Sequence, residues 1–371
     1  MLADALNHID VVIPSFRMDE QFLLGIFNLK KPMDFEVTYY LVCDHPQVLV
    51  PNSIQRLAND GTITLLINSL NLGPSQTRNK GIDCGHGAWI LLLDDDIIPG
   101  ADLLLVYADA IRKNRTSIGF SGVTAFPDPI NSITKALLLN GVLGHFYLSR
   151  TKENQRWSPT SNIMLNRELL SSRRFRVEWT SAEDVELLVR NSLENDCYYL
   201  SLPKAEITHP WWNAGKMQLK RMFNYGYGNA IILKFPHIKM YSYVDFSNTS
   251  ESSSILLLLS GIAFLLGCNY TIYLKLLVII LLAEYLTNLI RAIIATRKFS
   301  LPLAWQMTIH KNTQELGFFY SLIKTGRLLF LFRRIDFGFN KPCPSPFRLN
   351  KWKIIKMSLI IGLLLLSSVF Y

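Results

Sequence analysis

Three consecutive carboxylates, Asp94, Asp95 and Asp96, follow directly on the apolar run 90–93. An unbroken apolar run bounded by turn residues is typical of a buried strand in a parallel sheet. Ligands of such sheets bind at the carboxyl ends of the strands. Adjacent carboxylates repel one another unless a cation joins them, and their hard oxygen atoms suit Mg²⁺ or Mn²⁺, usually shared with a substrate phosphate. Taken alone, the run fits a polar loop after a strand equally well.

A second acidic pair, Glu183 and Asp184, lies in the segment 179–190. Ser181 with Asp184, or Thr180 with Glu183, has the spacing of a capping box at a helix start. Acidic residues in a first helical turn also interact favourably with the helix dipole. On these residues alone, a structural role is favoured.

His209 follows a predicted strand and precedes two tryptophans. It is a candidate third metal ligand or a donor to a diphosphate. Packing or an interfacial position explains a lone histidine beside tryptophans equally well.

The elements that must position these residues alternate in type. The sequence predicts strands at 9–14, 36–43, 62–67, 90–93, 117–126 and 198–208, and helices at 20–29 and 103–113. Ser75 is the expected N-cap of a further helix. Strands that alternate with helices predict βαβ units and a mostly parallel sheet, which is an α/β fold.

Composition bounds the class of protein. The 371 residues predict about two domains. Hydrophobic residues make up 49% of the chain, and basic residues exceed acidic residues by nine. The excess fits the positive-inside bias of a membrane protein, and no basic run or nucleic-acid motif favours nucleic-acid binding. Five scattered cysteines without a C-x-x-C pair indicate neither a disulfide framework nor a zinc site.

The chain after residue 235 is rich in apolar runs. Three transmembrane helices are expected, at 253–271, 273–294 and 354–371, because each is close to the roughly 20 residues that a span needs. Interfacial helices are expected within 301–335. Glu284 is an acid within a span, either functional or paired with Lys275 or Arg291. A buried helical bundle is the alternative.

Basic residues around positions 297, 333 and 353 place the connecting loops in the cytoplasm. We therefore expect a catalytic domain over 1–235 on the cytoplasmic side, and a membrane region over 236–371. The expected location is a bacterial inner or plasma membrane.

Three motifs, VVIPSF, NLGPSQTRNKGI and LLLDDDIIPG, occur in an order and spacing that resemble the family 2 glycosyltransferases. The resemblance extends over about residues 9–230, and it implies that a strand gives way to a helix within 161–169, beside the acceptor. It implies a GT-A fold, a Rossmann-like domain that binds a nucleotide-sugar, followed here by the membrane helices.

The resemblance also implies residue roles on the donor side. Asp96, helped by Asp94 and with His209 as a candidate, would hold Mg²⁺ or Mn²⁺ on the diphosphate. Asp44 stands where the family often has paired acids, and a single acid leaves a UDP-sugar or a GDP-sugar open. The implied nucleotide-sugar pocket comprises Pro14, Ser15, Arg17, Asp44, Asn71, Arg78, Asp94 and Asp95.

On the acceptor side, Glu183-Asp184 matches the Glu-Asp motif of the family, whose Asp is the usual general base. Gln218 and Arg221 match a motif that faces the acceptor or the diphosphate, although interfacial placement also explains Arg221. Met222 replaces the tryptophan of processive members. This replacement argues against a processive synthase.

The resemblance therefore implies an inverting glycosyltransferase that acts on a hydroxyl of a lipid-linked or polysaccharide acceptor at the membrane. A polyprenyl-phosphate glycosyltransferase and a processive polysaccharide synthase are the enzymatic alternatives. A membrane scaffold that retains the fold is the non-enzymatic one.

Overall fold

A computed structural model describes residues 7–179, 181–343 and 347–369 of the chain. The chain divides into two compact units. The sheet unit comprises the chain up to Asp128, Leu143–Trp211 and Gly338–Asn340; the helical unit comprises Pro129–Val142, Trp212–Phe337 and the chain from Lys341. These units are not the continuous segments 1–235 and 236–371 that we expected from the sequence, because residues 129–142 join the helical unit.

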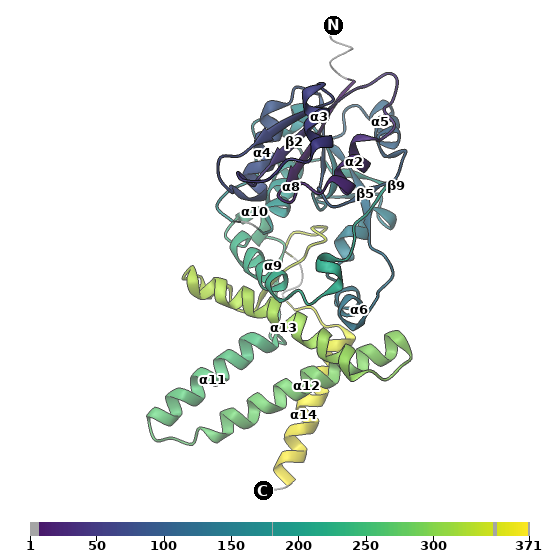
Figure 1. The fold of residues 1–371 in the computed structure, drawn as a ribbon. Coiled ribbons are helices and arrows are strands. Elements are labelled where there is room, and N and C mark those ends of the chain that lie inside the picture. Colours follow the sequence, from purple (N-terminus) through teal and green to yellow (C-terminus); the bar gives the residue numbers. More distant parts are fainter. Residues whose placement is uncertain (1–6, 180, 344–346, 370–371) are drawn as a thin grey trace. The chain divides into compact units, whose positions relative to one another are not determined.

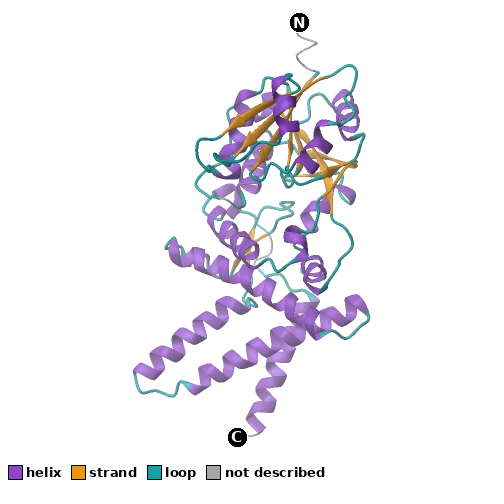
Figure 2. Ribbon diagram, viewed as in Figure 1, coloured by secondary structure: helices purple, strands orange, loops and turns teal. Residues whose placement is uncertain are grey.

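A nine-stranded sheet forms the centre of the sheet unit, with strand order β3-β2-β1-β4-β8-β6-β9-β5 and β7 paired with β9 (Figures 1 and 2). Its first four strands are parallel. They are β1 His8–Ser15, β2 Glu36–Cys43, β3 Ile63–Ile67 and β4 Trp89–Leu93. Every residue of β4 is buried, as expected for a strand covered on both faces. The predicted α/β fold with parallel strands is confirmed.

The other strands make the sheet mixed. β8 pairs antiparallel with both β4 and β6, β6 and β9 are parallel, and β5 and β7 pair antiparallel with β9. Their bounds are β5 Ile98–Pro99, β6 Gly119–Ala125, β7 Asn154–Gln155, β8 Asn162–Asn166 and β9 Tyr199–Thr208.

The helices between the strands are α2 Glu20–Phe27, α3 Asn52–Asn59, α4 Gly73–Cys84, α5 Leu103–Lys113, α7 Arg167–Leu170 and α8 Glu183–Glu194, with a 3-10 helix η1 at Gly144–Arg150. Apolar side chains of α2, α3 and α5 form one large core with the sheet. The strand-to-helix change predicted within 161–169 is β8 followed by α7.

Two helix starts differ from the sequence prediction. α4 begins at Gly73 with Leu72 as its N-cap, so Ser75 lies inside the helix and does not cap it. α8 begins after Ala182, which is left-handed (φ 66°), and no side chain caps this helix. The predicted capping box of Ser181 with Asp184 is therefore wrong, and Thr180 lies outside the described residues.

The helical unit contains the long helices of the chain (Figure 1). Its elements are α6 Ser132–Leu139, η2 Trp212–Gly215, α9 Leu219–Ile232, α10 Pro236–Lys239, β10 Ser242–Val244, α11 Thr249–Leu265, α12 Thr271–Thr296, α13 Leu301–Lys324, η3 Leu328–Phe330, β11 Arg333–Ile335 and α14 Lys351–Val369. The segment 301–335, where we expected interfacial helices, is one long helix followed by η3 and a strand that pairs with β10.

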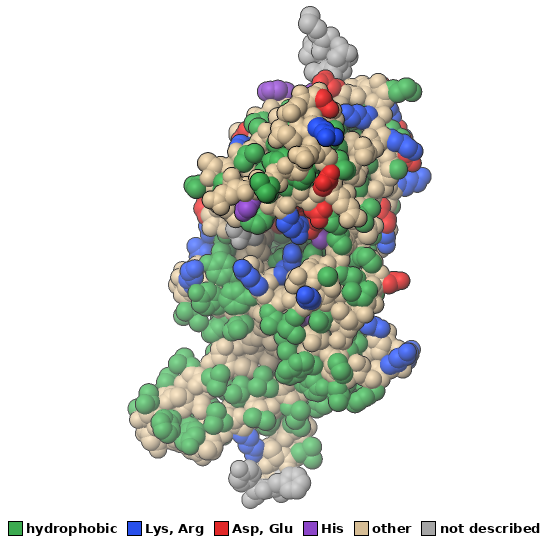
Figure 3. All heavy atoms as spheres, in the orientation of Figure 1, with side chains coloured by type: hydrophobic (Ala, Val, Ile, Leu, Met, Phe, Trp, Pro, Cys, Tyr) green, Lys and Arg blue, Asp and Glu red, His purple; other side chains and the backbone are tan. Residues whose placement is uncertain are grey.

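One helix of the described residues, α12, is long and apolar enough to cross a membrane. α11 is also apolar but has 17 residues. Hydrophobic side chains gather over α11 and α12 on the face seen in Figure 3. Exposed examples on the two helices are Leu258, Phe264, Leu265, Ile272 and Val278.

Glu284 on α12 is buried and forms ion pairs with Lys311 on α13 and Lys356 on α14, both at 2.7 Å. The partners that we expected from the sequence, Lys275 and Arg291, were wrong. Helical spacing shows only which residues share a face, whereas the packing of α12, α13 and α14 determines which charges meet.

Candidate active site

The site begins where two parallel neighbours of the sheet end. β1 ends at Ser15 and β4 ends at Leu93, and the two strands pair in parallel. Residues 15–17 and the Asp triplet therefore emerge at the same edge. This edge, at the carboxyl ends of the strands, is where ligands of open α/β sheets bind.

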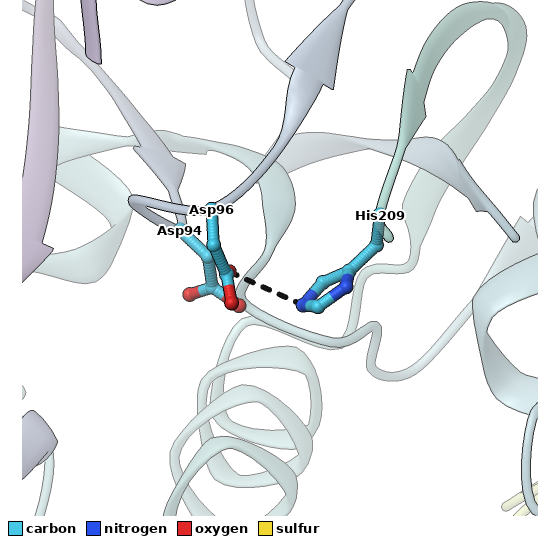
Figure 4. Close-up of side chains that lie close together, drawn as sticks. All are labelled: Asp94, Asp96 and His209. Carbon is cyan, nitrogen blue, oxygen red and sulfur yellow. Dashed lines mark ion pairs between the residues drawn. The ribbon is translucent and has the colours of Figure 1, made fainter. Parts of the chain in front are cut away.

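Asp94, Asp96 and His209 each direct one ligand atom to a common place, with all three atoms within 4.8 Å of one another. Figure 4 shows both carboxylates at the end of β4 and the imidazole after β9, with Nε2 of His209 3.2 Å from Oδ1 of Asp96. Two carboxylate oxygens and one imidazole nitrogen are a ligand set that suits Mn²⁺ or Mg²⁺, with positions left for substrate oxygens. The residues fit the expected metal.

The electrostatics of this cluster favour the charged forms. Burial raises the pKa of Asp96, but hydrogen bonds and charges from His209 and Arg17 outweigh burial and lower it. Burial lowers the pKa of His209, and the adjacent Asp96 more than reverses this effect. Arg17 approaches Asp96 to 2.5 Å with a side chain that is 59% exposed. A bound cation would take the place of the Arg17 guanidinium and of the His209 proton beside this carboxylate, because a histidine that ligates a metal is neutral.

Asp95 shares Arg17 with Asp96, but its closest partner is Ser15. Its carboxylate accepts hydrogen bonds from the Ser15 hydroxyl at 2.7 Å and from Arg17 at 3.2 Å, and the residue is buried. Burial raises its pKa. Asp95 therefore links the end of β4 to the end of β1 through its hydrogen bond with Ser15. It does not belong to the cluster of Asp94, Asp96 and His209.

Arg78, on α4, connects the two acidic stretches of the sequence. Its guanidinium is buried and lies 3.0 Å from Asp94 and 3.3 Å from Glu183. The ring of Phe175 lies 5.8 Å from the guanidinium carbon. One cation therefore holds the metal-site candidate and the start of α8 together.

Asp184 follows Glu183 at the start of α8 and is partly buried. One carboxylate oxygen of Asp184 accepts a hydrogen bond from the Val185 N–H. Burial, and then the charge of Glu183, raise the pKa of Asp184 to about 7. A carboxylate with this pKa can accept a proton at neutral pH more readily than an ordinary aspartate.

The remaining nucleotide-site candidates of the sheet unit are Asp44 directly after β2, Asn71 in the loop before α4, and Pro14 in β1. Asp44 accepts hydrogen bonds from the backbone N–H groups of Leu72 and Gly73, both at 2.8 Å, and from the Asn68 amide at 2.9 Å. The Asn71 side chain accepts from the Gly73 N–H at 3.3 Å. Pro14 lies within β1, one residue before Ser15. Asp44 thus supplies the cap that we had assigned to Ser75.

Gln218 and Arg221 belong to the helical unit. The Gln218 amide donates to the carbonyl oxygens of Trp212 and Lys216, and the Arg221 guanidinium lies 4.3 Å from the Trp212 ring centre. Both side chains thus have partners within their own unit.

The sequence analysis missed Phe126. Its ring stacks on the His209 imidazole, with centroids 5.3 Å apart, and packs against Trp211 and Phe146. It follows β6 directly, so an aromatic residue at the carboxyl end of a predicted strand was the signal available. Phe126 therefore supports the His209 imidazole by stacking alone, because the phenylalanine side chain offers no polar atom.

Residues 10–176 match the protein family described as Glycosyl transferase family 2. This part of the chain is a family 2 glycosyltransferase domain. The match contains Ser15, Arg78 and the Asp triplet. Glu183, Asp184 and His209 follow it in the sequence. The fold brings Glu183 to Arg78, and His209 to Asp94 and Asp96.

Solved structures similar to this glycosyltransferase have low sequence identity. S. aureus TarS 1-349 in complex with UDP-GlcNAc is 15% identical, with a TM-score of 0.44, over 90% of this chain and 98% of that one. The mannosyltransferase PcManGT from Pyrobaculum calidifontis, in complex with GDP-Man and Mn²⁺, is 12% identical, with a TM-score of 0.44, over 96% and 86%. The match with a longer S. aureus TarS structure (15% identity, TM-score 0.41) covers 61% of this chain and 39% of that chain. No curated protein sequence matches the glycosyltransferase.

Proposed function

We propose that the protein transfers a sugar, with inversion, from a nucleotide-diphosphate sugar to an acceptor hydroxyl. The observation that carries this proposal is the convergence of Asp94, Asp96 and His209 beside the pair Arg78–Glu183. The three side chains provide an acidic site for a cation. Asp184, which follows Glu183 in the chain, provides a carboxylate whose raised pKa suits a general base. Inverting transfer needs both functions on opposite sides of the reacting carbon.

On the donor side, Asp94, Asp96 and His209 would hold Mg²⁺ or Mn²⁺. When bound, the metal neutralises charge on the diphosphate leaving group. Ser15 and Asp95 shape the adjoining loop through their 2.7 Å hydrogen bond. Pro14, Asp44, Asn71 and Arg78 complete the proposed nucleotide pocket, which accepts a UDP-sugar or a GDP-sugar.

Arg17 has a separate role on the donor side. Its exposed side chain now pairs with Asp95 and Asp96. Because a long exposed arginine can change rotamer at small cost, it can leave Asp96 when a cation binds. Its guanidinium then donates to phosphate oxygens, for which its planar fork is well suited.

On the acceptor side, Asp184 accepts the proton of the attacking hydroxyl. Glu183 stays paired with Arg78 and raises the proton affinity of Asp184 through its charge. The oxygen then attacks the anomeric carbon from the face opposite the nucleotide, so the configuration inverts. A lipid phosphate acceptor would need no such base, and the pKa of Asp184 therefore favours a hydroxyl.

We further propose that the acceptor is lipid-linked or a membrane-associated glycan, met at the cytoplasmic face. The length and composition of α12 and the exposed apolar side chains of α11 and α12 support attachment to a membrane. Gln218 and Arg221 are the proposed contacts to the acceptor or the diphosphate.

The test is a panel of UDP- and GDP-sugars assayed for nucleotide release by the detergent-purified full chain with Mn²⁺. We expect one donor to be used and Asp96→Ala to reduce the rate by about 10²–10³-fold, as loss of a charge-stabilising group does. Asp102→Ala is the matched control, because Asp102 is exposed and pairs with Lys30 at 2.9 Å. Full activity of Asp96→Ala would overturn the metal assignment, and failure to bind any nucleotide-sugar would overturn the proposed reaction.

A further inference from the structure

The helical unit contains a partly open cavity of about 390 Å³, with a mixed polar and apolar lining, among α12, α13, α14 and the segment before α11. Its charged lining is unequal, with more cations than carboxylates. The charged residues are Arg291, Lys311, Lys353, Lys356, Asp245 and Glu284. A positive lining inside a largely apolar unit indicates an anionic ligand, because an uncompensated buried charge is costly.

Each of the three lysines forms an ion pair with a carboxylate of the lining, whereas Arg291 forms none among the described residues. Glu284 pairs with Lys311 and Lys356, and Asp245 pairs with Lys353 at 2.8 Å. Arg291 donates only to neutral oxygens, Oδ1 of Asn288 and the carbonyl of Leu139, both at 3.0 Å. Among the described residues, no carboxylate lies within ion-pair distance of Arg291. Glu284 acts on Arg291 only at longer range, so the guanidinium can still form an ion pair with a ligand in the cavity.

The neutral side chain of Asn140, which also lines the cavity, indicates a second property of the ligand. The Asn140 amide nitrogen donates to the Met307 carbonyl at 2.9 Å, while its Oδ1 is buried and has no hydrogen-bond partner. A buried acceptor without a donor is destabilising. A ligand that carries a hydroxyl group as well as a negative charge would satisfy both Asn140 and Arg291.

The position of the cavity along its helices indicates where the ligand comes from. The Arg291 guanidinium lies 5.7 Å from the ring of Trp352, which also lines the cavity. Trp352 and Lys353 precede the apolar stretch of α14, and Arg291 lies towards the end of the apolar α12. Trp, Lys and Arg at the ends of apolar helices are typical of the headgroup level of a membrane.

We propose that this cavity binds the phosphate headgroup of an anionic lipid, with Arg291 as the main donor. An arginine can hold two phosphate oxygens at once, which a lysine cannot. The proposal rests on the proposed membrane attachment and is independent of sugar transfer. The lipid can be a bulk phospholipid or a phosphate-bearing isoprenoid, since the two share the phosphate chemistry.

The experiment measures binding of lipids to the full chain in a neutral detergent, without nucleotide-sugar, by native mass spectrometry and by the shift of Tm. The probes are phosphatidylglycerol, farnesyl phosphate, phosphatidylcholine and inorganic phosphate. We expect at least one of the two anionic lipids to bind about tenfold or more tightly than phosphatidylcholine, and the stronger one identifies the source. Equal binding of inorganic phosphate, or no preference over phosphatidylcholine, would overturn the proposal.

Variants connect the binding to the cavity. Arg291→Gln should weaken binding of the preferred lipid about tenfold, the loss expected for one charge-assisted contact, and Arg291→Lys should weaken it less. Lys298→Gln is the matched control, since Lys298 is exposed just beyond the end of α12 and does not line the cavity. If Arg291→Gln does not fold, Arg291→Lys decides the question, because it keeps the charge but cannot hold two phosphate oxygens at once. Wild-type binding by folded Arg291→Gln, or by Arg291→Lys where the glutamine variant does not fold, contradicts the proposal.

A catalytic control keeps this proposal separate from the proposed function. Because Asp96 lies in the sheet unit, the Asp96→Ala variant should bind the lipid as the wild type does. Lipid binding together with a wild-type failure to use any nucleotide-sugar would overturn only the proposed reaction. Sugar transfer without lipid preference would overturn only the lipid site.

Discussion

Asp94, Asp95 and Asp96 are adjacent in the chain and differ in their partners. Asp94 meets Arg78, Asp95 meets Ser15, and Asp96 meets His209. Successive residues after a strand point in different directions, so three carboxylates in a row need not act together. Their substitution should therefore have different consequences.

Asp96→Asn and Asp95→Asn separate these roles. We expect Asp96→Asn to weaken Mn²⁺ binding tenfold or more, because one charged ligand is lost, with little change in stability. Asp95→Asn should leave Mn²⁺ binding within about twofold and lower the free energy of unfolding by about 1–2 kcal/mol, since it disturbs a buried hydrogen bond. Calorimetric titration with Mn²⁺ and urea unfolding measure the two effects. Equal loss of Mn²⁺ affinity in both variants would contradict the separation.

The pKa of Asp184 predicts the pH dependence of the reaction. A general base acts in its deprotonated form, so kcat/KM should rise with pH, reach half of its maximum near pH 7 and then level off. Asp184→Asn should be about 10²–10⁴-fold slower and lack this rise. Initial rates from pH 5.5 to 8.5 test both statements. A variant with near-normal rates would favour a phosphate acceptor over a hydroxyl.

The same pKa affects stability with a defined sign. Because the folded pKa of Asp184 lies above its ordinary value of 3.8, the native state binds the proton more tightly than the unfolded chain. The resulting stabilisation is present below about pH 4 and is lost as pH rises through about 7. Asp184→Asn should therefore be relatively more stable than the wild type at pH 8 than at pH 5, as measured by urea unfolding at the two pH values.

At the scale of elements, two helices of the helical unit touch through glycines. A Cβ added at Gly226 on α9 would lie 1.8 Å from the Gln314 carbonyl oxygen, and one at Gly317 on α13 would lie 2.0 Å from that of Phe223. Both contacts are with backbone atoms, which cannot move independently of their helices. The close approach of α9 and α13 therefore depends on these two glycines.

Gly317→Ala should separate α9 from α13 and lower the free energy of unfolding by about 1–3 kcal/mol, the usual cost of overpacking. Gly261→Ala on α11 is the matched control, because its Cβ would meet no atom within 4 Å. Alanine there should be neutral or stabilising by up to about 1 kcal/mol, as in most helices. Thermal unfolding in detergent compares the two, and equal Tm values would show that the glycine contact is dispensable.

At the scale of the whole molecule, the exposed apolar residues predict attachment to a membrane. The full chain should sediment with membranes and resist extraction by high salt and alkaline carbonate. Leu258→Glu combined with Leu281→Glu should increase the extracted fraction, since both side chains are exposed on apolar helices and charge there opposes lipid contact. Leu49→Glu, at a highly exposed leucine of the sheet unit, is the control and should change nothing. Complete extraction of the wild type by salt would contradict membrane insertion.

Local patterns were sufficient for most elements of the sheet unit. The strand 36–43 and the helix 103–113 were predicted with their observed bounds, because apolar alternation and turn residues act within a few positions. The same patterns failed at the starts of α4 and α8. α4 is capped by Asp44 from a distant strand end, and α8 starts at a left-handed alanine, neither of which any local spacing encodes.

The sequence by itself determined the α/β class, the acidic strand end and the apolar C-terminal helices, since each depends on neighbouring residues. Only the tertiary structure decided which distant groups meet. Arg78 contacts both Asp94 and Glu183, and Glu183 lies 105 residues after Arg78 in the chain. His209 completes the cluster with Asp94 and Asp96. Glu284 pairs with lysines of two other helices, and this pairing leaves Arg291 for a ligand. These pairings depend on how strands and helices pack, which periodicity along one element does not specify.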